Sequence, residues 1–299
     1  MMAALPRVAI YDRLQNEGMG FGLLGYKSVE DLPSNGLYEM MAGVEQLPVY
    51  QKLESVGVDV MRRTAQNFAK SFGVDPKALQ ETIHYADKPN PEKGEEMTPE
   101  EEWTVASLEL YGDEVRVQVD TALRATLSYW NEADLEASGV TLPVDINFAG
   151  RVSGDEFQAA TEYLTAQYKE SLGFLQPEFL LTGGDYNALG EQYYEILMYE
   201  GGDPLEAFLN AQLQPVHFTQ VRGEKLLQGI TSTSLAAMDL IGDYPILTEN
   251  EAQEKLTAGD AMSNYGGGFP GVDHLAQTTI VYREGAKGIV LPYYEFTVE

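Results

Sequence analysis

Apolar and polar residues alternate through much of residues 106–120 with the period of a β-strand. The alternation spans positions 106–110, breaks at Gly112-Asp113, and resumes in 115–120. Successive side chains of a strand point to opposite faces, so these segments predict an antiparallel hairpin with one buried face. Further strand-like segments lie at 125–130, 193–199, 216–221 and 226–231. Because strands dominate and no strand–helix–strand order recurs, the sequence predicts an α+β fold with antiparallel sheets.

Two segments have apolar residues at helical spacing, and a glycine follows each. The first covers residues 61–72 before Gly73, and the second covers residues 157–172 before Gly173. Glycine is a common helix stop because it readily adopts the left-handed conformation of the cap. The tetrapeptides that end at these glycines, Lys-Ser-Phe-Gly and Glu-Ser-Leu-Gly, match in residue type and lie 100 residues apart. We therefore expect two related α+β units, each with a helix packed on an antiparallel sheet.

These patterns divide the chain into three parts. Residues 1–45 form an irregular, glycine-rich segment, residues 46–148 the first α+β unit, and residues 149–299 the second. In the second unit, Thr248 and Glu251 have the spacing of a capping box at a helix start. Segments 275–283 and 289–298 then predict a terminal hairpin.

Composition excludes several classes of function. The 299 residues include 19 Lys and Arg against 47 Asp and Glu, a formal net charge of −28. Such a charge repels phosphate backbones, so we expect no nucleic-acid binding. The chain has no Cys, which excludes disulfides, thiolate metal sites and Cys nucleophiles. No apolar run approaches the roughly 20 residues that a membrane-spanning helix needs.

The sequence contains no strong catalytic or cofactor motif. Residues 20–25 match G-x-G-x-x-G, but no strand pattern precedes them and no long helix pattern follows, so we expect a loop and no nucleotide cofactor. The histidines, His84, His217 and His274, are too far apart in sequence for zinc-ligand spacing. No serine has the G-x-S-x-G context of a hydrolase. Carboxylates are abundant, so a glycosidase-like pair stays open as an alternative.

Aromatic residues near the C-terminus are the candidates for ligand or partner binding. Tyr265 and Phe269 bracket a Gly-Gly-Gly loop, which is typical of a mobile recognition loop. Tyr293 and Tyr294 lie on the last predicted strand, where tyrosines are usually half-buried sheet residues but also form platforms for sugars or peptides. We therefore select Tyr265, Phe269, Tyr293 and Tyr294 as binding residues and expect no catalytic or metal-ligating residue.

A set of short motifs in residues 243–298 resembles a known type of module. The motifs are Asp243-Tyr244-Pro245-Ile246-Leu247-Thr248, then Glu251-Ala252 and Lys255-Leu256, then Thr279-Ile280-Val281-Tyr282-Arg283 and Leu291-Pro292-Tyr293-Tyr294-Glu295-Phe296. They resemble the C-terminal module of uncharacterised surface lipoproteins from Gram-positive gut bacteria. That module looks like the YycH/YycI-type extracytoplasmic regulators and, more loosely, PepSY-like domains. Gln46-Leu47-Pro48-Val49-Tyr50 also looks like the strand that opens the first unit of such lipoproteins.

The resemblance implies a non-enzymatic binding or regulatory protein outside the cytoplasm. It implies a protein or cell-envelope ligand as partner, and a lipid or N-terminal anchor that is missing from this sequence. It carries over no catalytic residue and no cofactor. The alternatives are a carboxylate-dependent hydrolase of envelope sugars or peptides, which requires two carboxylates in one cleft, and a PepSY-like protease inhibitor.

Overall fold

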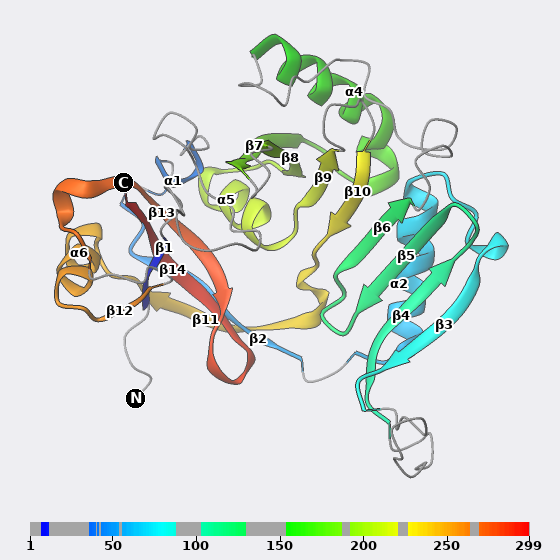
Figure 1. Ribbon diagram of the computed structural model, residues 1–299, viewed down its shortest axis with the longest axis horizontal. Helices are drawn as coiled ribbons and strands as arrows, with labels where there is room; N and C mark the ends of the chain where they lie inside the picture. Colours follow the sequence, from blue (N-terminus) through cyan, green and yellow to red (C-terminus); the bar gives the residue numbers. More distant parts are fainter. Residues whose placement is uncertain are drawn as a thin grey trace.

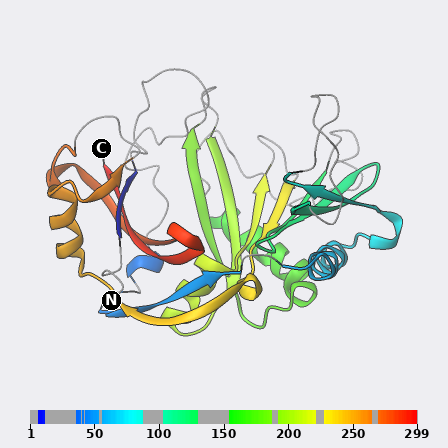
Figure 2. The same cartoon turned by 90° about the horizontal axis from the view of Figure 1, so that it is seen from below.

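The computed structural model shows two β-sheets, one of eight strands and one of six (Figure 1). It describes residues 7–11, 36–39, 41, 43–53, 56–87, 103–129, 154–186, 192–220, 227–263 and 269–298. Figure 2 shows the sheets side by side, with β2 (Gln46–Lys52) and β11 (Met238–Pro245) running along the same edge of the molecule from one sheet toward the other. The predicted α+β class with antiparallel sheets is confirmed.

The larger sheet has eight strands and consists of two similar halves. Each half is a helix followed by four antiparallel strands. The first comprises α2 (Val58–Ser71), β3 (Gln80–Tyr85), β4 (Val105–Tyr111), β5 (Val115–Asp120) and β6 (Ala125–Tyr129). The second comprises α4 (Gly154–Leu172), β7 (Pro177–Tyr186), β8 (Gln192–Glu200), β9 (Val216–Gln220) and β10 (Leu227–Ser232), and it differs from the first by a further helix, residues 204–213, between β8 and β9. The strand order across the sheet is β3-β4-β5-β6-β10-β9-β8-β7. The last strands of the two halves, β6 and β10, therefore pair with each other, antiparallel, at the centre of the sheet.

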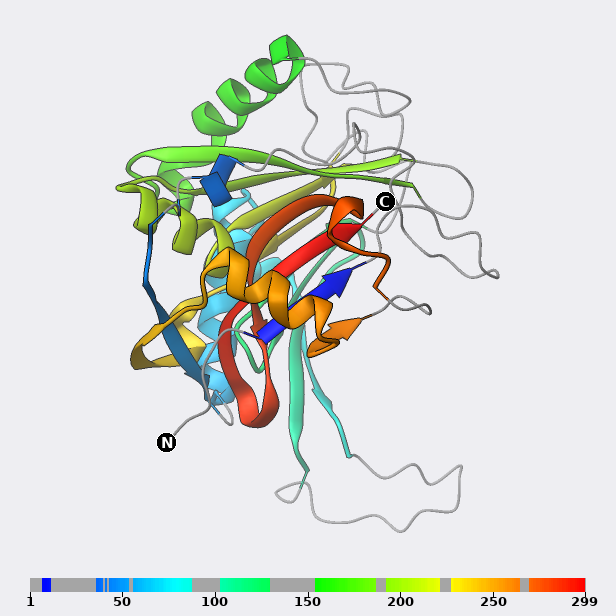
Figure 3. The ribbon, with the colours of Figure 1, turned by 90° about the vertical axis from the view of Figure 1, so that its left-hand side faces the viewer.

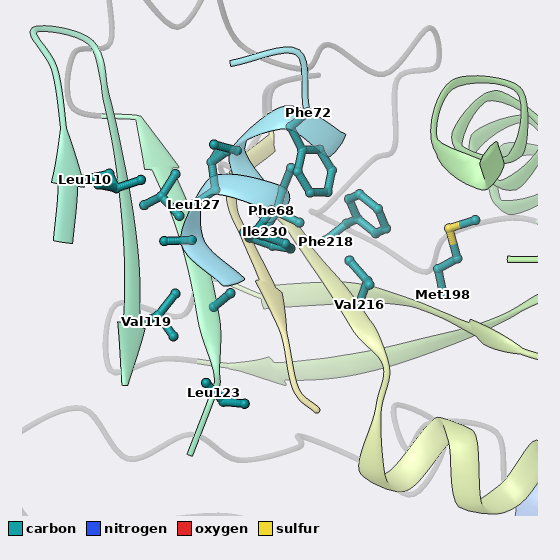
Figure 4. Packing of buried hydrophobic residues seen from close by; sticks show 14 of the residues in the cluster. Phe68, Phe72, Leu110, Val119, Leu123, Leu127, Met198, Val216, Phe218 and Ile230 are labelled. Atoms are coloured by element: carbon teal, nitrogen blue, oxygen red, sulfur yellow. The ribbon is translucent and has the colours of Figure 1, made fainter. Parts of the chain in front are cut away.

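Both helices bury their apolar side chains in one core with this sheet. Helix α2 buries Met61, Ala65, Phe68 and Ala69, and α4 buries Ala160 and Leu164. The strands supply alternate apolar residues, and Figure 4 labels Leu110, Val119, Leu127, Met198, Val216, Phe218 and Ile230 among them, together with Phe68 and Phe72 from α2 and its C-cap. Each fully buried Val, Leu, Ile, Phe or Met side chain stabilises the fold by about 1.5–3 kcal/mol. The two halves therefore form a single core.

An aromatic cluster joins the two helices to the second half of the sheet. The ring centroid of Phe72, at the end of α2, lies 5.0 Å from that of Tyr168 on α4 and 6.3 Å from that of Phe218 on β9. Tyr168 and Phe218 stack with centroids 5.9 Å apart. Aromatic pairs at these separations add to the stabilisation that burial gives. The C-terminal ends of α2 and α4 are thus held close together.

The helix ends are related as the sequence predicted. Gly73 and Gly173 have φ values of +76° and +81°, the left-handed region that favours glycine. At each end, the glycine N–H and the following N–H donate to carbonyls of the last helical turn. The match over 100 residues therefore marks two structurally equivalent helix caps.

The smaller sheet has six strands around the C-terminal strand β14 (Ile289–Val298). One edge of β14 pairs with β13 (Leu275–Glu284), and the other pairs first with β2 and then, in parallel, with β1 (Arg7–Tyr11). Strand β11 pairs with β2, and β12 (Ala261–Ser263) pairs with β1. Helices α1 (Gly36–Glu39) and α6 (Glu249–Thr257) cover one face, and Figure 3 shows α6 lying across β14 and β1.

Helix α5 (Pro204–Leu213) lies between the two sheets (Figure 1). Its Phe208 belongs to the core cluster of the six-stranded sheet, whereas Ala207 and Ala211 pack with Tyr199 of β8. The Gln212 side chain also accepts a hydrogen bond from the Tyr282 backbone N–H at 3.3 Å. One helix thus contributes to the packing of both sheets.

Several local predictions are confirmed. The Thr248–Glu251 capping box is present at the start of α6, and the terminal hairpin is β13–β14. Short 3-10 turns occupy Pro76–Ala78, Leu235–Ala237, Val272–His274 and Ala286–Gly288. The G-x-G-x-x-G segment lies outside the described residues. Strands β3, β7, β11 and β12 and helices α1 and α5 were not predicted from the sequence.

The sheets do not follow the predicted division of the chain. The boundary at residues 148 and 149 falls between β6 and α4, and each predicted unit gives four strands to the eight-stranded sheet. The six-stranded sheet takes β1 from segment 1–45, β2 from the first unit and four described strands from the second. The two units share sheets because strands pair across long separations that local patterns do not encode. Their status as separate domains stays a prediction.

Candidate functional site

Two of the four predicted binding residues are buried in the core. Tyr293 and Tyr294 are 1% and 4% exposed and point to opposite faces of β14. Tyr293 packs with Val49 and Leu291. The Tyr294 hydroxyl donates to the Leu247 carbonyl at 3.0 Å, and burial, followed by Glu249 and Glu251, raises the pKa of Tyr294 to about 12. Since β14 has strands on both edges and is covered on both faces, neither ring is a surface platform, and the sequence interpretation is corrected here.

The other two predicted residues, Tyr265 and Phe269, precede β13 in the sequence. Phe269 is half-buried and packs against the same core cluster as Tyr294. Tyr265 lies outside the described residues. Of these two residues, the structure therefore describes Phe269, and the described contacts of its side chain are with the core.

A pocket of about 600 Å³ lies where the two halves of the eight-stranded sheet meet. We call it the junction pocket. Its wall comes from the C-terminal parts of α2, α4 and α5 and from the strand ends next to them. The lining residues are Thr64, Asn67, Phe68, Ser71, Leu123, Ala125, Leu172, Gly173, Phe174, Leu175, Glu200, Asn210, Gln214, Val216, Ser232, Thr233 and Ser234. Volumes of this size are typical of small-molecule sites.

The lining combines apolar side chains with amides and hydroxyls. Glu200 is the one charged residue among the described lining residues. Its two carboxylate oxygens accept the backbone N–H groups of Leu175 and Gln176, each at 2.8 Å. These bonds fix the loop after α4. Leu175 itself is 78% exposed at this position.

Hydrogen bonds also position the polar groups on the α5 side of the pocket. The Gln214 amide donates to Asn210 Oδ1 at 3.0 Å, and the Asn210 amide donates to the Glu200 carbonyl at 2.9 Å. The Thr233 hydroxyl donates to the Leu213 carbonyl at 3.1 Å. This side of the wall is therefore ordered by its own contacts before any ligand binds.

On the opposite side, the ends of α2 and α4 are joined by Ser71. Its hydroxyl lies 2.8 Å from the Ser171 carbonyl and 3.2 Å from the Asn67 carbonyl, so it can donate to either. Within the described part of the chain, the side chains of Thr64 and Asn67 make no hydrogen bond. Both residues line the pocket.

A second pocket, of about 510 Å³, lies beside α6 in the six-stranded part. Its polar centre is the Tyr38 hydroxyl, which donates to Glu249 at 3.0 Å, with the Gln253 amide 3.3 Å from the same carboxylate. Burial, and then the Glu249 charge, raise the pKa of Tyr38 well above its usual value. The pocket therefore has one carboxylate among its described lining residues, and that carboxylate already accepts two hydrogen bonds.

The face of the eight-stranded sheet opposite α2 and α4 carries scattered ion pairs. Glu109, with a side chain 13% exposed, lies 3.5 Å from His84 and 3.6 Å from Arg116. Farther along the sheet, His217 lies 3.4 Å from Glu195. In the described residues, no group of three or more acidic or histidine side chains has the arrangement of a metal site.

Among the described residues of the six-stranded sheet, Glu295 is the buried carboxylate. Its side chain is 4% exposed and accepts a 2.6 Å hydrogen bond from Arg283 on the neighbouring strand. A buried charge requires such a partner, so this pair has a structural explanation. Neither pocket contains the two carboxylates that a hydrolase would require among its described residues.

No protein-family model matches the chain, and no curated protein sequence does so either. Among solved structures, an uncharacterised protein from Eubacterium rectale ATCC 33656 aligns with a TM-score of 0.40 and 10% identity, over 84% of this chain and 75% of that one. Among the described residues, no helix combines the length and the hydrophobicity needed to cross a membrane.

Sequence reasoning missed the junction pocket. Its residues come from segments that are distant in sequence and form no local motif. One signal was present: the matched helix ends 100 residues apart form two adjacent parts of its wall. The third part, from α5, had no counterpart in the predictions.

Proposed function

We propose that the protein is a non-enzymatic binding protein of the cell envelope and that its ligand occupies the junction pocket. The observation that carries this proposal is the composition of the pocket wall. A ligand-sized volume is lined by apolar, amide and hydroxyl groups, several of which are already oriented by hydrogen bonds. The one carboxylate of the described lining orients a loop, which suits a site that binds a ligand without transforming it.

The location at the envelope rests on the resemblance of residues 243–298 to modules of surface lipoproteins. The strong negative charge is compatible with an exported protein, because a large net charge keeps a domain soluble. Fractionation of cells that produce the natural protein, followed by detection with an antibody, tests this part. Recovery with the membrane or cell wall supports it, and recovery with the cytoplasm contradicts it.

The binding site is tested with a variant that fills the pocket. Asn67 lies on the exposed side of α2 and lines the pocket, so Asn67→Trp places a large ring there without disturbing the core. The matched control is Gln158→Trp, at an exposed position near the start of α4 and outside the pocket. Ligand-observed NMR with a library of small polar metabolites measures binding to the wild type and to both variants.

We expect at least one compound to bind the wild type and Gln158→Trp but not Asn67→Trp. The proposal is overturned if no compound shows this pattern. Turnover of any bound compound, seen as new product signals in the same spectra, would instead indicate an enzyme.

A further inference from the structure

We infer that the junction pocket selects a small organic cation, an ammonium or guanidinium group carried on a short apolar chain. This inference rests on the proposed function and specifies the chemistry of the ligand. It follows from the observation that the C-terminal ends of α2, α4 and α5 form the pocket wall.

Three helices direct their C-terminal ends to the pocket. The lining includes Ser71 from the last turn of α2, Leu172 from the last turn of α4, and the α5 C-cap residue Gln214. The C-terminal end of a helix carries a partial negative charge, because the dipoles of its peptide groups add along the helix axis. Three such ends around one volume produce a negative potential in it.

The side chains of the wall reinforce this potential. Glu200 contributes a full negative charge, and no Lys, Arg or His occurs among the described lining residues. Lys70 and Lys169 lie in the last turns of α2 and α4, but neither lines the pocket. An anion would therefore meet a carboxylate and three negative helix ends, whereas a cation would be stabilised by both.

The remaining groups fit the other parts of such a ligand. Asn67 Oδ1 and the Thr64 hydroxyl can accept hydrogen bonds from an ammonium or a guanidinium. Phe68, Leu123 and Phe174 supply apolar surface for the methylene groups of the ligand. A pocket of about 600 Å³ accommodates a molecule of the size of arginine or a polyamine.

The test uses a charge series at one position. Asn67→Lys, Asn67→Gln and Asn67→Glu change the charge at the pocket, and all three residues are good helix formers, so α2 is retained. Spermidine, arginine and a lysine tripeptide blocked at both ends are titrated by calorimetry at 0.15 M salt, and citrate and glucose serve as anionic and neutral probes. The two free cations represent a small-molecule ligand, and the tripeptide represents a side chain of a partner protein.

We expect at least one of the three cationic probes to bind, with affinity falling about tenfold in Asn67→Lys through charge repulsion and rising in Asn67→Glu. In Asn67→Gln, which moves the amide oxygen but adds no charge, the affinity should fall less than in Asn67→Lys. Gln158→Lys is the control for general attraction to a chain of charge −28, because it makes the same charge change outside the pocket. It should leave the affinity within about twofold of wild type.

Equal losses in Asn67→Lys and Gln158→Lys would overturn the inference, because binding would then be non-specific. Absence of binding by all cationic probes would also overturn it. If a neutral or anionic compound binds in a manner blocked by Asn67→Trp while the cations do not bind, the proposed function stands and the charge assignment fails. If no compound of any charge is affected by Asn67→Trp, both fail.

Discussion

At the scale of single residues, one hydroxyl group links the two halves of the eight-stranded sheet through their helices. The Ser71 hydroxyl lies within hydrogen-bond distance of the Ser171 carbonyl, at the equivalent position of the other helix. The Ser171 hydroxyl is not used in the same way, because it donates to the Tyr168 carbonyl of its own helix at 3.3 Å. The equivalence of the two helix ends is therefore broken at this pair of side chains.

This asymmetry predicts different effects for two identical substitutions. Ser71→Ala should lower the free energy of unfolding by about 1 kcal/mol, because it removes the bond between the helices. Ser171→Ala should have less than half that effect, because a hydroxyl that bonds within its own helix contributes little to helix stability. Urea denaturation followed by circular dichroism measures both. Equal effects would show that the hydroxyl of Ser71 does not link the halves.

At the scale of secondary-structure elements, the two helix caps depend on glycine for the same reason. Gly73→Ala and Gly173→Ala should each lower the free energy of unfolding by about 1 kcal/mol, since a β-carbon is disfavoured in the left-handed region. Space is not the cause, because a Cβ at either position meets no atom within 4 Å. Thermal or urea unfolding of the two variants measures the effect.

Gly154→Ala is the control for these caps. Gly154 begins α4, has no positive φ, and also has open space around its Cβ position. Alanine there should raise the free energy of unfolding by up to about 1 kcal/mol, because it lowers the conformational entropy of the unfolded chain. A destabilisation similar to that of the cap variants would contradict the role assigned to the positive φ angles.

How well an element could be predicted depends on how many neighbours it packs against. Helix α2 faces one sheet, so its apolar stripe is clear in the sequence. Helix α5 packs on both sheets, with Phe208 toward one and Ala207 toward the other, and its apolar residues therefore form no single stripe. Its start does carry a signal in the sequence, Asp203 as N-cap followed by Pro204, although no helix was predicted there.

Contacts with several neighbours also explain why the predicted binding residues Tyr293 and Tyr294 are buried. The sequence correctly placed Tyr293 and Tyr294 on a strand, but it did not show that β14 lies between β13 on one edge and β1 and β2 on the other. Long-range pairing buried both rings. The junction pocket depends on the pairing of β6 with β10 and on three separate helix ends, so only the matched caps near Gly73 and Gly173 were visible in the sequence.

At the scale of the whole molecule, the contacts of α5 with both sheets predict that the sheets unfold together. Buried tyrosines report on each sheet. Burial, followed by Glu178, raises the pKa of Tyr199 on β8 to about 12, and the pKa of Tyr294 on β14 is raised to about 12 as well. An unfolded tyrosine titrates near pH 10. Above that pH, the unfolded chain loses protons that the folded protein retains.

The resulting prediction concerns alkaline unfolding. The contribution of these tyrosines to stability is fully present below pH 10 and is lost as the pH rises through about 12, since the raised pKa belongs to the folded state. Exposed tyrosines titrate near pH 10 without unfolding. Above that phase, tyrosinate absorbance at 295 nm and far-ultraviolet circular dichroism, recorded on the same samples, should therefore show one coincident transition as the pH rises through about 12. Tyr199→Phe and Tyr294→Phe should each reduce the absorbance change of that transition by about one tyrosine, whichever sheet carries the residue. Two separated transitions, one affected by each variant, would show that the sheets unfold independently and that α5 does not couple them.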